Sequence, residues 1–299
     1  MKFFVVLFIA FFYCPKGWTT PAKIEDTCQI NPKQCLKLVE ERLHTGVEPK
    51  TSEWYRFKFL QIQALFDLEQ AQALSKVLNE LNSISALPTF LQLKVYILSA
   101  KNAMFRNNVQ DFDLYKSKTF TLMKALNLDT LDPYSLIEYA NFHIYLKDYQ
   151  TGIELLLPLE EKFRDHPNSE LKKTIYTNLG NMHALQKLYK DAFSYFKLAF
   201  ENAQLSLNKH YALMTHYNVA RSHQMLEMHH EAEQIFLDVL AAEKTIGHPT
   251  IKNLCHYRLA MYYSEQNYHS KLKIHLEQVD PTKLSTKLLN KYQLLLSNE

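Results

Sequence analysis

Three histidines recur at 40-residue intervals, at His143, His183 and His223, and this spacing is the first feature of the sequence that could carry chemistry. Imidazole nitrogens are common metal ligands, and a metal ion needs its ligands at about 2 Å. Equivalent positions on neighbouring packed helices lie roughly 10 Å apart, which is too far for one shared ion. We therefore interpret these histidines as packing residues between helices, and we predict no metal site.

Cys255 and His256 form a second candidate, because an imidazole can activate a thiol as a nucleophile. Such a pair also needs an orienting group and a cleft, whereas a single cysteine on a helix is typically a small core residue. The segment from His230 to Gln234 fails the HExxH metalloprotease pattern at its last position, and no phosphate-binding loop, GxSxG or dinucleotide motif occurs. We predict no catalytic residue and no cofactor. A hydrolase or metal enzyme is the third alternative, and a deep pocket of titratable groups would favour it.

Small residues show the elements that must position these side chains. One series recurs every 40 residues, at Ala100, Ala140, Gly180, Ala220 and Ala260. A second series follows twelve residues later, at Gly152, Ala192 and Ala232. In the copy around Gly180, apolar residues after Ala192 follow the i, i+3, i+4, i+7 spacing of an amphipathic helix. Each unit is therefore predicted to be two antiparallel helices joined by a tight turn. Pro158 falls inside one of these helices and is expected to kink it or end it early.

These units resemble tetratricopeptide repeats. The copy that matches best carries the aromatic, small and apolar positions of that motif, at Tyr176, Leu179, Gly180, Tyr189, Ala192, Phe196 and Ala199. The resemblance covers roughly residues 50–285 and weakens toward both ends, with a degenerate second helix expected near Tyr115 to Leu126. It implies an all-α fold, a right-handed α-solenoid of tetratricopeptide-like helical hairpins. We expect a signal peptide at 1–22, a capping helix within 23–49, about six hairpins at 50–283 and a capping helix at 284–299.

The first residues indicate export. Met1-Lys2 is followed by an unbroken apolar run from Phe3 to Tyr13, too short to span a bilayer, and Ala22 ends a possible small-residue cleavage site. We predict a periplasmic or secreted protein with no membrane span in the mature chain. Lipid modification at Cys14 is the alternative, but the large residues before Cys14 disfavour it.

Three cysteines follow the predicted signal peptide. Cys28 and Cys35 flank Asn31-Pro32, where the chain can turn, so we predict that they form a disulfide pinning the first helix in an oxidising compartment. Two free thiols are the alternative. The third, Cys255, has no cysteine nearby in the sequence.

Composition limits the class of partner. The net charge is +3, of which Lys2 and Lys16 contribute two positive charges in the predicted signal region, so nothing favours binding to nucleic acid or an anionic membrane. A Cys-bearing first helix followed by long repeats is more distantly similar to periplasmic tetratricopeptide sensor modules of Gram-negative signalling proteins. That resemblance implies a membrane-bound signalling protein as a partner.

The first helix of each hairpin is expected to line the concave side of a solenoid, where such proteins bind their ligands. The predicted binding residues are Asn141, Tyr145, Asn181, Tyr217, Arg221, Gln224 and Tyr257. Asparagine can pair with a peptide backbone, arginine with a carboxylate, and tyrosine offers a flat apolar surface. We predict a non-enzymatic scaffold or sensor that binds a protein or peptide in this groove. Two alternatives stay open: an assembly factor or chaperone for exported proteins, and an inner surface that is merely solvated.

Overall fold

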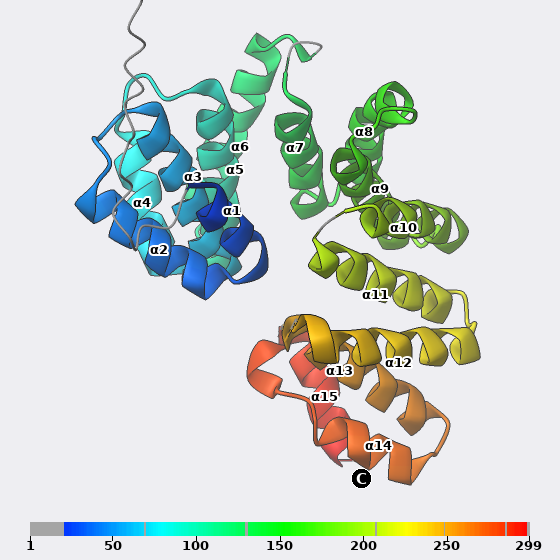
Figure 1. Ribbon diagram of the computed structural model, residues 1–299. Helices are drawn as coiled ribbons and strands as arrows, with labels where there is room; N and C mark the ends of the chain where they lie inside the picture. The colour runs from blue at the N-terminus through cyan, green and yellow to red at the C-terminus, as the bar shows by residue number, and fades with distance from the viewer. Residues whose placement is uncertain are drawn as a thin grey trace, which may run out of the picture. The chain divides into compact units, whose positions relative to one another are not determined.

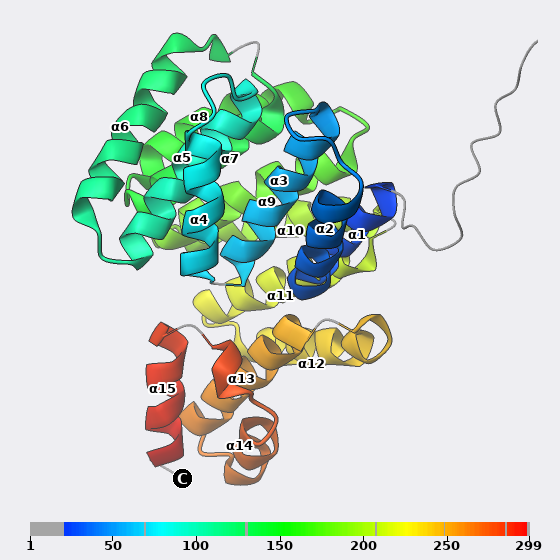
Figure 2. The same cartoon turned by 90° about the vertical axis from the view of Figure 1, so that its left-hand side faces the viewer.

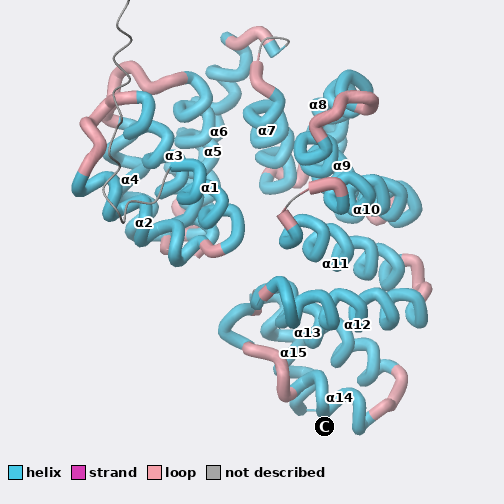
Figure 3. The backbone as a smooth tube through the Cα atoms, in the orientation of Figure 1, coloured by secondary structure: helices cyan, strands magenta, loops and turns pink. Residues whose placement is uncertain are grey.

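A computed structural model describes residues 21–68, 70–128, 131–206, 208–247, 249–284 and 286–297. The secondary structure of this part of the chain is entirely helical (Figure 3). The chain divides into two compact units, Met1–Ser85 and Ala86–Glu299. None of the described helices is long and apolar enough to cross a membrane. Most of the predicted signal peptide, residues 1–20, lies outside the described residues.

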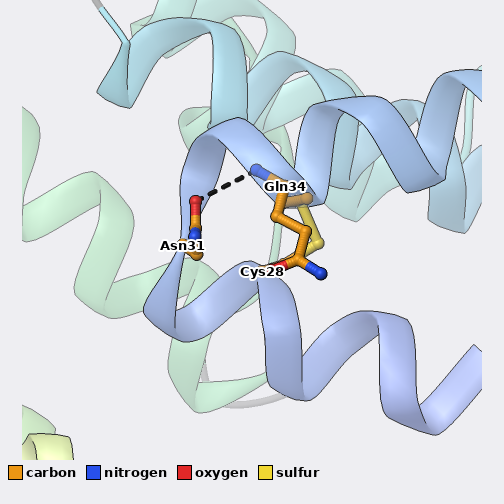
Figure 4. The surroundings of a disulfide bond; sticks show 4 residues. Cys28, Asn31 and Gln34 are labelled. Carbon is orange, nitrogen blue, oxygen red and sulfur yellow. Dashed lines mark hydrogen bonds between the residues drawn. A yellow bond between two sulfur atoms is a disulfide. The ribbon is translucent and has the colours of Figure 1, made fainter. Parts of the chain in front are cut away.

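The described part of the first unit contains four helices, α1 (Pro21–Ile30), α2 (Pro32–Thr45), α3 (Ser52–Asp67) and α4 (Ala71–Asn82). A disulfide joins Cys28 on α1 to Cys35 on α2 (Figure 4). The single capping helix predicted for this region is therefore wrong, because two helices occupy it. Pro32 disfavours helical conformation at Asn31, and the Asn31 side chain instead caps α2 by accepting a hydrogen bond from the Gln34 amide at 3.0 Å.

The second unit is a series of helix pairs closed by a last helix (Figure 1). The pairs are α5 (Thr89–Phe105) with α6 (Val109–Ala125), α7 (Pro133–Tyr145) with α8 (Tyr149–Phe163), α9 (Ser169–Leu185) with α10 (Tyr189–Gln204), α11 (Lys209–Met225) with α12 (His229–Ile246), and α13 (Pro249–Glu265) with α14 (His269–Leu276). A short 3-10 helix, η2 (Pro281–Lys283), leads to α15 (Thr286–Ser297), which packs on α13 (Figure 2). With α3 and α4 of the first unit, the described residues contain six helical hairpins, so the predicted class of helical-hairpin solenoid is confirmed.

Packing within the second unit follows the 40-residue step. The two helices of each pair pack together, and α8, α10 and α12 also pack on the next first helix, α9, α11 and α13. The small residues of the first series are fully buried where the helices approach. A Cβ placed on Gly180 would lie only 2.7 Å from ring carbons of Phe196, so a larger residue there would collide with the opposite helix.

The turn between the two helices of each pair repeats as well. A non-glycine residue with φ between 54° and 64° stands two residues after the end of each first helix of the second unit, at Asn107, Lys147, Lys187, Glu227 and Asn267. At Lys187 the next amide, that of Leu188, donates to the His183 carbonyl at 2.9 Å, and the Lys187 amide donates to the Ala184 carbonyl at 3.1 Å. This is the Schellman arrangement, which satisfies the last carbonyls of a helix and usually places glycine at the left-handed position. The recurring histidine thus stands where its carbonyl closes the turn.

Two expectations about second helices are corrected. Pro158 does not end its helix, because α8 continues to Phe163. The buried Leu156 and Leu159 lie on either side of it, and we attribute the continuation to their burial, which offsets the lost backbone hydrogen bond. The second helix expected near Tyr115 to Leu126 is a full helix, α6, that starts earlier, at Val109, and is capped by the Asn108 side chain.

Candidate functional site

The recurring histidines pack against aromatic rings, as the sequence predicts. The centre of the His143 ring lies 6.0 Å from that of Phe120, His183 lies 5.1 Å from Tyr195, and His223 lies 4.8 Å from Phe193. Burial lowers the pKa of His143 and of His223. Over the described ranges no three metal-ligating side chains gather at one point. These rings therefore belong to the contacts that hold the helices together.

The Cys255 thiol is fully buried, and burial raises its pKa well above the usual range. Its neighbour His256 faces another histidine, His275, rather than the thiol. A cavity of about 390 Å³ lies elsewhere, beside α6, and it contains none of the predicted site residues. Its lining residues are Asp113, Lys116, Ser117, Phe120, Thr121 and Lys124. The structure thus gives no nucleophile–base pair at the positions where the sequence suggested one.

The predicted binding residues lie on the first helices α7, α9, α11 and α13, but their exposure differs. Asn141, Asn181, Arg221 and Gln224 are partly exposed. Tyr145 is also partly exposed. The Lys101 ammonium lies 4.6 Å from the centre of its ring, and the centre of the Phe105 ring lies 6.4 Å away.

Two of the predicted residues are buried. Tyr217 and Tyr257 expose only 5% and 1% of their surface and belong to the core around α11 and α13. The expectation that their rings offer an open apolar surface to a ligand is therefore wrong. Tyr217 packs instead on Phe236 of α12, with ring centres 5.7 Å apart. A large ring in the first helix fills the space that the small residue of the same turn leaves beside it.

A set of polar atoms on these same helices is covered from solvent and has no hydrogen-bond partner in the described structure. The set comprises Glu138 Oε2, Asn141 Oδ1, Thr177 Oγ1, Arg221 Nε, Tyr257 OH and Arg258 Nε. Each residue stands two or three positions before the small residue of its helix, or one position after it, and this spacing defines one helix face. Buried polar atoms are normally paired, so these atoms are exceptions that the described contacts of the chain do not satisfy.

Charge is distributed unevenly along this face. Near its start, Glu138 on α7 accepts a hydrogen bond from the Lys94 ammonium on α5 at 2.6 Å. Burial opposes ionisation of Glu138, but Lys94 and Lys101 together hold the pKa of its carboxyl below the ordinary value.

Near its end, Arg221 on α11 donates from Nη1 to the Asn218 side chain at 3.3 Å. The structure shows no ion pair between Arg221 or Arg258 and any residue of the described ranges. Asn178 on α9 donates to the Thr174 carbonyl of the preceding turn at 2.8 Å. Sequence reasoning missed Glu138 and Arg258, although their distance from the small residue places them on the same helix face.

Comparison with known protein families supports the helical-hairpin repeat. Residues 173–244, from α9 to α12, match the tetratricopeptide repeat family. No curated protein matches the sequence. With the hairpins described above, this shows a helical-hairpin solenoid in which residues 173–244 are similar to tetratricopeptide repeats.

Solved structures share that fold at low sequence identity. A Rap protein complexed with competence and sporulation factor has a TM-score of 0.57 at 14% identity, covering 93% of this chain and 85% of its own. NprR in complex with its cognate peptide NprX has a TM-score of 0.57 at 16% identity, covering 93% and 82%. Human IFIT1, as a dimer with PPP-AAAA, has a TM-score of 0.61 at 14% identity, covering 90% and 60%.

Proposed function

We propose that this protein binds a peptide or an extended protein segment along the first helices of its second unit, and that it catalyses no reaction. The observation that carries the proposal is the row of partly exposed polar side chains on the first helices α7, α9 and α11, which comprises Asn141, Asn181, Arg221 and Gln224. An extended peptide presents backbone donors and acceptors at regular intervals, and it could satisfy them in turn.

Asn141 and Asn181 are the residues we assign to the ligand backbone. They occupy the same position of successive first helices, α7 and α9, which pack on each other. Both are partly exposed, and Asn141 Oδ1 has no hydrogen-bond partner among the residues that the structure describes. A carboxamide can donate and accept at once, which is what a peptide group requires. Arg221 would bind an acidic group of the ligand.

The comparisons support a peptide as the ligand. NprR was solved with its cognate peptide, and Rap with competence and sporulation factor. Their folds are similar to this one over most of both chains.

The protein would act in the periplasm or outside the cell, with a membrane-bound signalling protein as a partner of the scaffold. The apolar run after Lys2 supports export, and the Cys28–Cys35 disulfide supports an oxidising compartment. The amino-terminal residue of protein recovered from the expressing cell tests this. Mature protein starting near residue 23 in the exported fraction is expected, whereas an intact Met1 in the cytosolic fraction would contradict export.

Binding is tested with a random peptide library panned on the purified mature chain. Peptides selected on the wild type should lose at least about tenfold in affinity when Asn181→Ala and Arg221→Ala are combined, since each removes a hydrogen bond to the ligand. Asn202→Ala, on the second helix α10, is the matched control. Unchanged affinity in the double variant, with circular dichroism showing a retained fold, would refute this binding face.

Chaperone or assembly work is the second candidate, and exposed apolar side chains favour it. Leu157, Leu198 and Leu237 lie on three successive second helices, each between 36% and 40% exposed. Such side chains can hold unfolded segments when they gather into a patch. Suppressed aggregation of a reduced, unfolded reporter that is lost when all three leucines are changed to glutamine would favour this function.

A further inference from the structure

Arg221 on α11 and Arg258 on α13 form a second, distinct feature within the polar face. The two helices pack on each other, and the charge of Arg258 is close enough to lower the pKa of Arg221. Burial lowers the Arg221 pKa further and is the larger cause. Each guanidinium also has an Nε atom that is covered from solvent and makes no hydrogen bond.

This arrangement is costly for the folded chain by itself. Partly buried charges in proteins are normally paired with an opposite charge, because desolvation penalises an isolated ion. The structure shows no carboxylate of the described residues paired with either guanidinium, and the acceptor that Arg221 does contact is the neutral Asn218 side chain. Two like charges are therefore held near each other without a paired carboxylate among the described residues.

Two buried tyrosines lie beside the arginines. The Tyr257 hydroxyl is buried and unpartnered, and the Arg258 guanidinium lies 5.9 Å from the centre of the Tyr257 ring. Tyr217 is near enough for its charge state to affect both Arg221 and Tyr257. A site with two fixed positive charges favours an anion with several acceptor oxygens.

We propose that Arg221 and Arg258 together bind a doubly charged phosphoryl group carried by the peptide ligand. The inference rests on the proposed function and names the acidic group that the ligand must bear. A single carboxylate offsets one of the two charges, whereas a phosphate monoester carries close to two negative charges at neutral pH and three acceptor oxygens. The planar forks of two arginines can share those oxygens.

The test measures binding to the mature full chain by calorimetry at matched ionic strength. The probes are inorganic phosphate, a library-selected peptide with one serine phosphorylated, and its unmodified twin. The phosphopeptide should bind more tightly than either of the others. Arg221→Gln and Arg258→Gln should each weaken it by about 10- to 100-fold, the usual range for losing a charged hydrogen bond. Arg164→Gln, an exposed arginine paired with Glu160, is the control and should have no effect.

A second readout separates a binding role from a structural one. Phosphate should raise the Tm of the wild type more than chloride does at equal ionic strength, and Arg258→Gln should abolish that difference. Without phosphate, Arg258→Gln should leave Tm unchanged or raise it, because it removes the repulsion. A Tm that falls without ligand would show that Arg258 only supports the fold.

Failure of this inference can be told apart from failure of the proposed function. If unmodified peptides bind through Asn141 and Asn181 and phosphorylation adds nothing, the phosphoryl assignment is wrong and peptide binding stands. If inorganic phosphate binds as tightly as the phosphopeptide, the group is free phosphate and is not carried by the peptide. Equal binding of succinate and phosphate would show that the site takes carboxylates, against the proposal.

Discussion

The Nδ1 atoms of His256 and His275 lie 2.9 Å apart, joining α13 to α14 across the last hairpin. In a hydrogen bond between two imidazoles, one nitrogen donates and the other accepts, so the pair is complete only when at least one ring is neutral. Burial is the main cause that lowers both pKa values, that of His256 to about 4. Lys252 adds to the effect at His256, and Lys271 at His275, where Glu233 opposes it.

This pair predicts that the protein loses stability in mild acid. The unfolded histidine takes up its proton near pH 6.5 and folded His256 only near pH 4, so the unfolded state binds more protons between these values. The contribution of the neutral pair is therefore complete above about pH 6.5 and falls by about 1–3 kcal/mol as pH drops toward 4. Urea unfolding from pH 7.5 to 4.5 should show a smaller loss for His256→Gln/His275→Gln than for the wild type. The exposed His230→Gln should behave as wild type, and an equal slope in the double variant would contradict the prediction.

The left-handed turn residue Lys187 predicts a stabilising substitution. Its φ of 64° is unfavourable for a residue with a Cβ and free of strain for glycine. Lys187→Gly should raise the free energy of unfolding by about 0.5–1 kcal/mol, the balance of relieved strain and added chain entropy. Lys197→Gly, at an exposed site inside α10, should instead lower it by about 1 kcal/mol. Guanidinium unfolding compares the two, and a loss of stability at Lys187 would count against the strain argument.

Gly180, where two helices approach closely, predicts a destabilising substitution. Gly180→Ala would place a methyl group 2.7 Å from ring carbons of the buried Phe196, which must move. We expect a loss of about 1–3 kcal/mol in the free energy of unfolding. Phe196→Leu is destabilising by itself, but combined with Gly180→Ala it should cost less than the sum of the two. Additive effects would show that the methyl group is accommodated without touching Phe196.

The disulfide predicts a redox-dependent first unit. Cys28 and Cys35 are seven residues apart, and opening so short a loop should cost about 2–3 kcal/mol. Hydrogen exchange of the α1 amides should become faster in Cys28→Ser/Cys35→Ser, and reductant should reproduce the effect in the wild type but add nothing in the variant. Protection of α1 that is the same in all four samples would mean that helix packing alone holds α1 in place.

Much of the fold follows from periodicity. The 40-residue step predicted the hairpins because a helix pair must place small residues at each close approach and large ones such as Phe196 beside them. It also predicted that His143, His183 and His223 pack between helices, since equal positions on successive helices are too far apart to share an ion. It did not predict α1 as a separate helix, because the stop at Asn31-Pro32 was interpreted only as a turn between cysteines.

By itself the sequence determined which helix face each residue occupies. A helix repeats every 3.6 residues, and the small residue of each copy serves as the reference position from which the faces are counted. It therefore placed Asn141, Asn181 and Arg221 on one face. Only the tertiary structure decided which of that face's atoms are covered and which find partners. Tyr217 and Tyr257 were assigned to a ligand, but neighbouring helices bury their rings. Arg258 was not among the residues predicted from the sequence. Its importance arises from its electrostatic effect on Arg221, which lies 37 residues away along the chain and is brought near only when α11 and α13 pack.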